Sequence, residues 1–210
     1  RRIAGPPKRN HAIAMEGRSL RRNAPTLVNV GYHRSFFHDG REPHLEEQVW
    51  GPLLTKAEMQ MPSMGYVTEK VRQLPEYKGL FEAAFGAPVT AERIGQAIAS
   101  YERTLISGNS RFDRWYYGGD KTALDPQEQR GFQVFMGKGR CATCHRVEEK
   151  SALFTDHKFH NTGIGWERTM FPERNAYKVQ LAPGIFVNVM GSLLKSFESP
   201  QPDVGRYEVT

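Results

Sequence analysis

The chain has 210 residues, a length that fits one large domain or two small ones. Its mean hydropathy is −0.59, and because no apolar run is long enough to cross a bilayer, we expect no membrane span. The net charge is +6, and much of the excess positive charge lies within the first 22 residues. Such a cluster can bind nucleic acid or an acidic protein. No nucleic-acid motif accompanies it, so we expect a solvated basic face and no bound nucleic acid, with an acidic protein partner as the alternative. The cluster consists of Arg1, Arg2, Lys8, Arg9, Arg18, Arg21 and Arg22.

The first half of the chain changes from irregular to helical sequence. Residues 1–22 are rich in Gly, Pro and Arg and lack periodicity, which predicts an extended loop. Residues 45–50 favour a short helix that Gly51 and Pro52 would end. From residue 66 the pattern is clearly helical, and Pro75 should end that helix. A further helix should close at Gly86.

Two later helices carry specific start signals. Thr90 can cap a helix that has Glu92 in its first turn. Asp125 can cap another, with Pro126 at the first helical position and Glu128 at capping-box spacing. The first helix has an apolar stripe of Ile94, Ala97, Ile98, Tyr101 and Leu105. Between the two helices lies an aromatic cluster that we interpret as core packing, formed by Phe112, Trp115 and Tyr116.

The second of these helices leads directly into Cys141-Ala142-Thr143-Cys144-His145, which contains both cysteines of the chain. A C-x-x-C-H sequence is typical of covalent c-type haem attachment, in which two thiols bind the haem and the histidine ligates iron. The same spacing also occurs in dithiol redox motifs and in halves of zinc sites. Zinc needs about four ligands, and the chain has no second C-x-x-C and no H-x-x-x-H. A thioredoxin-like motif would lie in a βαβ pattern, which is absent here. We therefore expect haem c at Cys141, Cys144 and His145.

The surroundings of the motif agree with a cofactor site. Gly131 and Phe135 lie one turn apart on the preceding helix, as at the start of small c-type cytochromes, where the glycine permits close helix approach and the aromatic ring covers the haem edge. Residues 153–156 and 159–163 favour loops around a cofactor, and residues 185–189 form a β-like run.

The order of the short motifs resembles the bacterial di-haem cytochrome c peroxidase family, including its MauG-like branch, from about Arg22 to Thr210. The motifs are R-N-x-P-T, F-F-x-D-G-R, L-x-E-Q, G-P, E-M, C-x-x-C-H and F-H-N-T-G. This resemblance implies a mainly α fold of cytochrome-c-like domains with long irregular loops around haem. It implies a partial N-terminal peroxidatic domain with interdomain helices at residues 1–118. Residues 119–210 would form a truncated C-terminal electron-transfer domain.

The resemblance also implies roles for individual residues. Cys141, Cys144 and His145 match the haem motif of the C-terminal domain, which takes in electrons. Gln48 and Glu58 match the glutamine and glutamate beside the peroxide-reacting haem, so we expect Glu58 to transfer the proton and Gln48 to orient peroxide. Asn23 matches an asparagine of a calcium site between the domains.

The sequence departs from the family pattern in three ways. The first C-x-x-C-H would lie upstream of Arg1, and the segment with the sixth ligand of the C-terminal haem would lie beyond Thr210, so we expect a mature or shortened piece of a larger protein. His38 stands where many relatives carry a tryptophan between the haems, so electron transfer between the haems should differ in rate or route. His11 is a loop histidine that near a haem could ligate iron or lie beside it. Sixth ligands inside the chain are less favoured by the resemblance: Met170, Met190, His157 and His160.

Three functions follow as hypotheses. The first is a periplasmic peroxidase that reduces hydrogen peroxide to water with electrons from a small redox protein, such as a cytochrome c or a cupredoxin. The second is a mono-haem electron-transfer protein. The third is a MauG-like oxidase that modifies a partner protein. Haem c is normally attached outside the bacterial cytoplasm, so a periplasmic location is expected, and the pattern is compatible with a homodimer.

Overall fold

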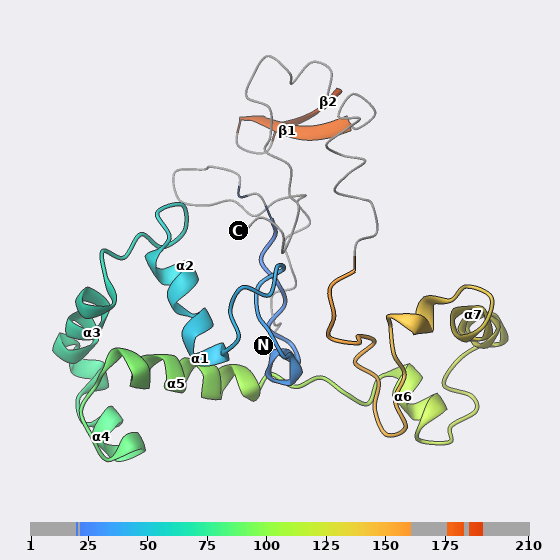
Figure 1. Ribbon diagram of the computed structural model, residues 1–210, viewed down its shortest axis with the longest axis horizontal. Helices are drawn as coiled ribbons and strands as arrows, with labels where there is room; N and C mark the ends of the chain where they lie inside the picture. The colour runs from blue at the N-terminus through green and yellow to red at the C-terminus, as the bar shows by residue number, and fades with distance from the viewer. Residues whose placement is uncertain (1–19, 21, 161–175, 183–184, 191–210) are drawn as a thin grey trace. The chain divides into compact units, whose positions relative to one another are not determined.

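The computed structural model describes residues 20, 22–160, 176–182 and 185–190, and these are mainly helical (Figure 1). The mainly α prediction is therefore confirmed. The described elements, with η for 3-10 helices, are η2 (Val30–Tyr32), α1 (Leu45–Gln48), α2 (Trp50–Leu54), α3 (Met64–Gln73), η3 (Pro75–Tyr77), α4 (Leu80–Phe85), α5 (Ala91–Arg103), α6 (Arg111–Tyr116), α7 (Pro126–Met136), η4 (Cys141–Thr143), β1 (Ala176–Ala182) and β2 (Ile185–Met190).

The chain divides into two compact units. The first comprises Arg1–Thr26, Ser35–Ala99 and Phe159–Thr210, and the second comprises Leu27–Arg34 and Ser100–Lys158. Each unit is defined by the contacts among its own residues. The boundary expected after Gly118 concerns haem-binding domains instead, and it stays a prediction. No helix of the described residues is long and apolar enough to cross a membrane.

The predicted caps form as hydrogen bonds. The backbone N–H of Arg93 donates to Thr90 Oγ1 at 3.2 Å, so Thr90 caps α5. Asp125 Oδ1 accepts the N–H groups of Gln127 and Glu128 at 2.8 Å each, and Glu128 Oε2 accepts the N–H of Asp125 at 2.8 Å. The capping box at the start of α7 is thus complete. Pro75 and Gly86 also act as predicted, since α3 ends at Gln73 and Gly86, at φ 68°, ends α4.

The prediction that Gly51 and Pro52 end a helix is wrong. Both lie inside α2, which follows α1 after a break at Val49. Pro52 is the third residue of α2, in the first turn, where backbone N–H groups have no partner within the helix, so its missing N–H costs nothing. Gly51 is required for packing, because a Cβ there would lie 2.6 Å from Cζ of Phe37.

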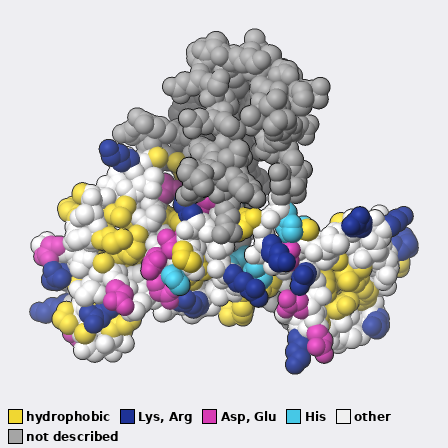
Figure 2. Space-filling view, viewed as in Figure 1, with side chains coloured by type: hydrophobic (Ala, Val, Ile, Leu, Met, Phe, Trp, Pro, Cys, Tyr) yellow, Lys and Arg dark blue, Asp and Glu magenta, His cyan; other side chains and the backbone are white. Residues whose placement is uncertain are grey.

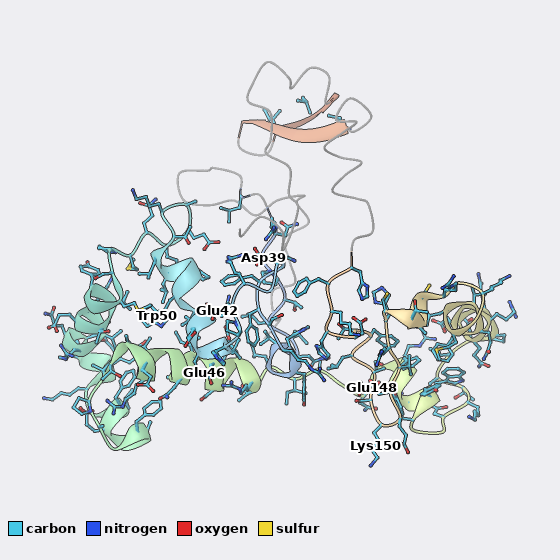
Figure 3. All side chains as sticks on the ribbon, viewed as in Figure 1. Asp39, Glu42, Glu46, Trp50, Glu148 and Lys150 are labelled. Carbon is cyan, nitrogen blue, oxygen red and sulfur yellow. The ribbon has the colours of Figure 1, made fainter. Side chains whose placement is uncertain are left out.

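The core of the first unit lies between the helices α2 to α5. Its buried residues are Trp50, Val67, Phe81, Val89 and Ile94. Helix α5 approaches α1 closely at Gly95, where a Cβ would lie 2.3 Å from the carbonyl oxygen of Glu46. Trp50 lies at the same crossing, 3.6 Å from that position through Nε1 (Figure 3). Because Gly95 has no side chain, α5 can approach the backbone of α1 this closely.

The core of the second unit is aromatic. The ring of Phe112 lies 5.3 Å from Phe132 and 5.1 Å from Phe154 between centroids, and it stacks on Tyr116 at 5.3 Å. The rings of the predicted cluster therefore pack on one another, but Phe112 and Trp115 are only half-buried and Tyr116 is 42% exposed, so core packing stays a prediction. Arg111 of α6 also binds the carboxylate of Glu128 with two hydrogen bonds of 2.7 and 2.6 Å, which joins α6 to α7.

The β-like run predicted at residues 185–189 is a strand. Strand β2 pairs with β1 in an antiparallel hairpin with Tyr177 opposite Val189 and Val179 opposite Val187. The register is interrupted between Gln180 and Ala182.

We predict that Gly95→Ala destabilises the first unit by about 1–3 kcal/mol, because the added methyl group collides with backbone that cannot rotate away. Urea unfolding followed by far-UV circular dichroism measures this change. Gly65→Ala in α3 is the matched control, since a Cβ there meets only Ser63 Oγ at 3.7 Å, and alanine has the higher helix propensity. Equal stability of the two variants would contradict the close crossing of α5 and α1.

Candidate functional site

The C-x-x-C-H motif occupies a tight turn after α7. Arg140 precedes η4 in the left-handed conformation with φ 54°, and its N–H donates to the carbonyl of Gly137 at 2.9 Å. The N–H groups of Cys144 and His145 both donate to the carbonyl of Cys141, at 3.2 and 2.9 Å. Both cysteines are free thiols. The turn thus presents two unpaired thiols and an imidazole within five consecutive residues.

The ring of His145 has a defined tautomer. Its Nδ1 lies 2.9 Å from the backbone carbonyl oxygen of Phe154. A carbonyl oxygen only accepts, so Nδ1 must carry the hydrogen and Nε2 keeps its lone pair. Such a bond is the usual support of a metal-ligating histidine, because it orients the ring and leaves the far nitrogen for the metal. The free thiols and the available Nε2 therefore fit covalent haem c.

Phe135 lies near the motif as expected, and its ring centroid is 6.3 Å from that of His145. It also contacts Phe154 edge-on at 5.9 Å, so the aromatic core of the second unit reaches the histidine. The close helix approach predicted at Gly131 is not found among the described residues, where a Cβ at Gly131 would meet no atom within 4 Å.

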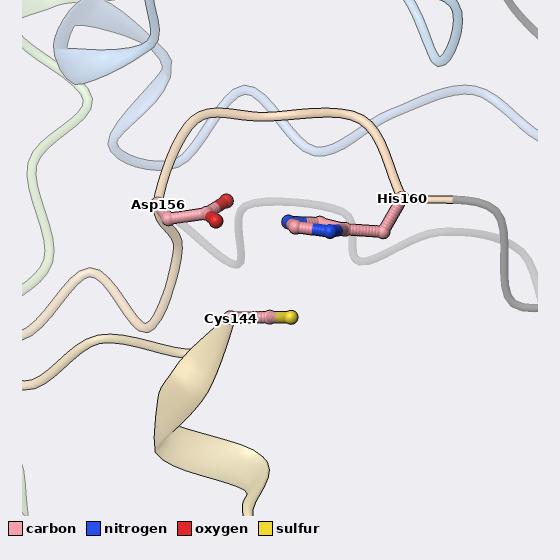
Figure 4. A group of neighbouring side chains, drawn as sticks. All are labelled: Cys144, Asp156 and His160. Atoms are coloured by element: carbon pink, nitrogen blue, oxygen red, sulfur yellow. The ribbon is translucent and has the colours of Figure 1, made fainter.

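Cys144 and Asp156 face the same space. Cys144 extends from the end of η4 and Asp156 from the loop that follows Phe154 (Figure 4). Cys144 Sγ and an Asp156 carboxylate oxygen lie within 4.8 Å of each other.

The residues considered as sixth ligands have different surroundings in the structure. His157 faces His33 edge-on with ring centroids 6.1 Å apart. Partial burial and the nearby charge of His157 lower the pKa of His33 below its ordinary value. His160 is exposed and belongs to the first unit. Met190 is the last residue of β2, and the structure does not describe its side chain. Met170 and His11 lie outside the described residues.

Gln48 and Glu58 lie in the first unit near the two ends of the α1–α2 segment. Gln48 is the last residue of α1 and is half-buried. Glu58 is also half-buried, in the turn after α2, where its N–H donates to the carbonyl of Thr55 at 2.9 Å. The turn is held on α2 by two further bonds, from Met59 N–H to the carbonyl of Pro52 and from Met61 N–H to the carbonyl of Leu53, at 3.1 and 2.8 Å. The backbone that carries Glu58 is therefore fixed.

Asp39 of this unit bonds two arginine side chains. Its carboxylate is buried, with 7% of the side chain exposed. It accepts from Arg22 Nη1 at 2.8 Å and from Arg41 Nη1 at 3.0 and 2.9 Å, so two guanidinium groups enclose it (Figure 3 labels its position). Burial raises the pKa of Asp39, but the bonds from Arg22 and Arg41 lower it by more, and the net pKa lies below its ordinary value.

This ionic cluster joins two of the sequence motifs. Arg22 belongs to R-N-x-P-T, whereas Asp39 and Arg41 belong to F-F-x-D-G-R. A second link lies beside it, because His38 Nε2 donates to the backbone carbonyl of Asn23 at 2.9 Å. His38 and Asn23, which the sequence singled out for separate roles, are thus in direct contact.

The same loop reaches α2 through Phe37. The guanidinium carbon of Arg41 lies 3.6 Å from the ring centroid of Phe37, a cation–π geometry. On α2, a Cβ at Gly51 would lie 2.6 Å from the Cζ atom of the same ring. The F-F-x-D-G-R loop is therefore held between Arg22 and the helix whose following turn carries Glu58.

The sequence reasoning missed several of these residues. Asp39, Arg22 and Arg41 stood inside quoted motifs, but nothing in their spacing showed that they would pair. Glu102 was also missed; it is 7% exposed, burial raises its pKa, and Oε2 has no hydrogen-bond partner among the described residues. Its position on α5 beside the apolar stripe was the available signal.

We predict that Asp39 stabilises the first unit at neutral pH and loses this effect in acid. A carboxyl group whose folded pKa lies below its unfolded value contributes above the unfolded pKa, near 4, and the contribution disappears as the pH falls through the folded pKa. Asp39→Asn should therefore cost about 1–3 kcal/mol of unfolding free energy at pH 7 and less at pH 3. Denaturant unfolding at both pH values measures this. Glu69→Gln, which removes an exposed carboxylate paired with Arg72, is the control, and an equal cost of Asp39→Asn at both pH values would contradict the prediction.

Comparison with known proteins identifies the family of this chain. Residues 2–122 match the sequence model of a family described as di-haem cytochrome c peroxidase. The chain is 40% identical over 147 residues to the methylamine utilization protein MauG of Methylorubrum extorquens, covering 69% of this chain and 40% of that protein. It is 36% identical over 168 residues to the cytochrome c551 peroxidase of Nitrosomonas europaea, covering 75% of this chain and 49% of that protein.

Solved structures give the same assignment. The diheme peroxidase BthA from Burkholderia thailandensis superposes with a TM-score of 0.60 at 29% identity, over 72% of this chain and 42% of that chain. The chain spans less than half the length of these curated relatives. The matched residues 2–122 contain Gln48, Glu58 and the Asp39 cluster, whereas the C-x-x-C-H lies after them. The chain belongs to the di-haem cytochrome c peroxidase family.

Proposed function

We propose that this chain is the part of a di-haem peroxidase that binds the haem taking in electrons and forms part of the pocket where hydrogen peroxide reacts at a second haem. The observation that carries the proposal is the hydrogen bond from His145 Nδ1 to Phe154 at 2.9 Å, beside two free thiols. This arrangement suits a c-type haem, which needs two thiols and one imidazole at this spacing.

At the first of these sites, Cys141 and Cys144 would hold the haem by thioether bonds and His145 Nε2 would ligate its iron. The haem, when bound, supplies one-electron redox chemistry. The protein contributes the orientation of the imidazole through Phe154 and an apolar surrounding that includes Phe135. The hydrogen bond that Nδ1 donates to the carbonyl of Phe154 also makes the imidazole a stronger ligand.

In the peroxide pocket, Glu58 would move a proton from the inner oxygen of the peroxide to the leaving oxygen. A carboxylate serves this task when it is held at hydrogen-bond distance from the substrate. The fixed turn after α2 provides such a hold for Glu58. Gln48, at the end of α1, would orient the peroxide through its amide, which both donates and accepts hydrogen bonds.

Asn23 and His38 carry two further proposed roles. Asn23 would contribute to a calcium site between an N-terminal domain at residues 1–118 and a C-terminal domain at residues 119–210. His38, bonded to the carbonyl of Asn23, would stand on the route of electrons between the haems. Calcium bound at Asn23 would then also fix the route through His38.

Hydrogen peroxide is the substrate that this assignment implies, and a small redox protein such as a cytochrome c or cupredoxin is the donor. We place the protein in the periplasm, because haem c is normally attached outside the bacterial cytoplasm. A homodimer is compatible with the proposed peroxidase function.

Oxidative modification of a partner protein is the second candidate function. It is favoured by the 40% identity to a protein named MauG. A mono-haem electron carrier would need only the second unit, and it leaves Gln48 and Glu58 without a role.

We predict that Cys144→Ala leaves haem attached through Cys141 alone. One vinyl group then stays conjugated with the porphyrin, so the α band of the pyridine haemochrome should move to longer wavelength. Thr143→Ala is the control within the motif, because Thr143 supplies no thiol and its Oγ1 bonds the carbonyl of Arg140 at 2.6 Å and Cys144 Sγ at 3.9 Å. An unshifted α band in Cys144→Ala, with haem still resistant to extraction, would rule out a thioether at Cys144.

We predict that Glu58→Gln lowers kcat for peroxide at least about 100-fold in the di-haem protein, because the amide cannot exchange the proton. Haem content and reduction of the haem at His145 should be unchanged. Steady-state peroxide consumption with a reduced cytochrome measures the effect. Glu47→Gln, an exposed carboxylate of α1, should retain full turnover. A Glu58→Gln protein with normal kcat would remove Glu58 from the mechanism.

A further inference from the structure

The residues directly next to the haem motif in the sequence carry only positive charge, and the first acidic residues after it are Glu148 and Glu149. From residue 129 to residue 147 the chain contains Arg130, Lys138, Arg140 and Arg146 and neither Asp nor Glu. Arg140 directly precedes the first cysteine, Lys138 lies three residues before it, and Arg146 directly follows His145. All three are exposed. We call Lys138, Arg140 and Arg146 the basic collar.

The backbone under the collar is fixed. The N–H of Gly139 donates to the carbonyl of Val134 at 2.8 Å, and the N–H of Arg140 donates to the carbonyl of Gly137 at 2.9 Å. Gly139 is packed so closely that a Cβ would lie 2.7 Å from the carbonyl oxygen of Val134. The positions from which the three cationic side chains project are therefore set by the same turn that presents the cysteines.

Arg140 occupies a conformation that favours glycine. Its φ is 54°, a left-handed backbone that costs a residue with a side chain roughly 1 kcal/mol. A strained position that keeps a long charged side chain points to a role for that side chain. No described residue forms an ion pair with Lys138, Arg140 or Arg146, so their charge faces outward rather than inward.

Apolar surface lies beside the collar. Val134 and Met136 on α7 are each 42% exposed. Hydrophobic side chains with basic ones around them are visible over this unit (Figure 2). A small apolar area with charges around it is typical of interfaces where an encounter is steered electrostatically and the complex then separates quickly.

We propose that the basic collar is the docking surface for an electron donor whose own redox centre is surrounded by acidic residues. The donor loses one electron and the haem iron held by His145 gains it, so the donor is a one-electron carrier, a small cytochrome or cupredoxin of low pI. This inference rests on the proposed function and adds the sign of the partner's surface. The three collar charges raise the local donor concentration, and salt weakens this effect over a Debye length of about 10 Å at 0.1 M.

The test is stopped-flow reduction of the haem in the intact protein by two probes, a reduced acidic cupredoxin and a reduced basic cytochrome c. We expect the second-order rate constant with the acidic probe to be the larger at low ionic strength and to fall as salt is added. The triple variant K138E/R140E/R146E should lower it about 10-fold or more and should raise the rate with the basic probe. The control K56E/K70E/K78E makes the same charge change on exposed lysines of the first unit and should alter either rate less than twofold.

A second variant separates docking from structure. Arg140→Gly relieves the left-handed strain and removes one collar charge, so its stability should be equal or higher while its rate with the acidic probe falls. Equal rates in wild type, K138E/R140E/R146E and Arg140→Gly, or a faster reaction with the basic probe in wild type, would overturn the proposal. Loss of peroxide turnover with normal haem reduction would instead count against the proposed peroxidase function and leave the collar intact. Retention of duplex DNA by the wild type but not the triple variant, with unchanged reduction rates, would assign the collar to nucleic acid and also overturn it.

Discussion

The buried carboxylate of Asp39 is the constraint on which the first unit depends. Removing a carboxylate from water is costly unless charge and hydrogen bonds replace its hydration. Here Arg22 and Arg41 supply three bonds of 2.8 to 3.0 Å between side chains. The loop cannot change shape without leaving that charge uncompensated. Its other contacts, His38 on the carbonyl of Asn23 and Phe37 against Gly51, are consequences of the same fixed loop.

The local features of the fold were predictable from the sequence, and the contacts between distant segments were not. The capping box at Asp125, the cap at Thr90 and the helix ends at Pro75 and Gly86 depend on residues at most four positions apart. Gly51 and Pro52 were misjudged because both ordinarily end helices. Their effect here is set by tertiary contacts, with Pro52 falling in a first turn and Gly51 lying under Phe37. The crossing at Gly95 likewise depends on Glu46, which no periodicity identifies.

The candidate site divides in the same way. The haem motif is a local signal, so Cys141, Cys144 and His145 were identifiable from five consecutive residues. The tautomer of His145 is fixed by the backbone carbonyl of Phe154. Every residue has such a carbonyl, so the amino-acid sequence cannot identify which one bonds the histidine. Gln48 and Glu58 came only from the resemblance, since half-buried polar residues near a helix end have no distinguishing pattern of their own. Asp39 lay in a recognised motif, but its role required seeing Arg22 beside it.

On the proposed function, the residues for electron uptake and the residues for peroxide chemistry belong to different units. The free thiols, the imidazole, Phe135, Phe154 and the basic collar all lie between residues 135 and 154, inside the second unit. On the proposed function, that segment supplies the two cysteines and the histidine that would attach a haem, the carbonyl that orients His145 and the cations that would attract a donor. Gln48 and Glu58 lie in the first unit and have no iron ligand beside them in the sequence. On the proposed function, their role depends on a second haem. Electron uptake would then be altered through the collar without changing the groups proposed to handle the proton, and proton transfer would be altered through Glu58 without changing how electrons arrive.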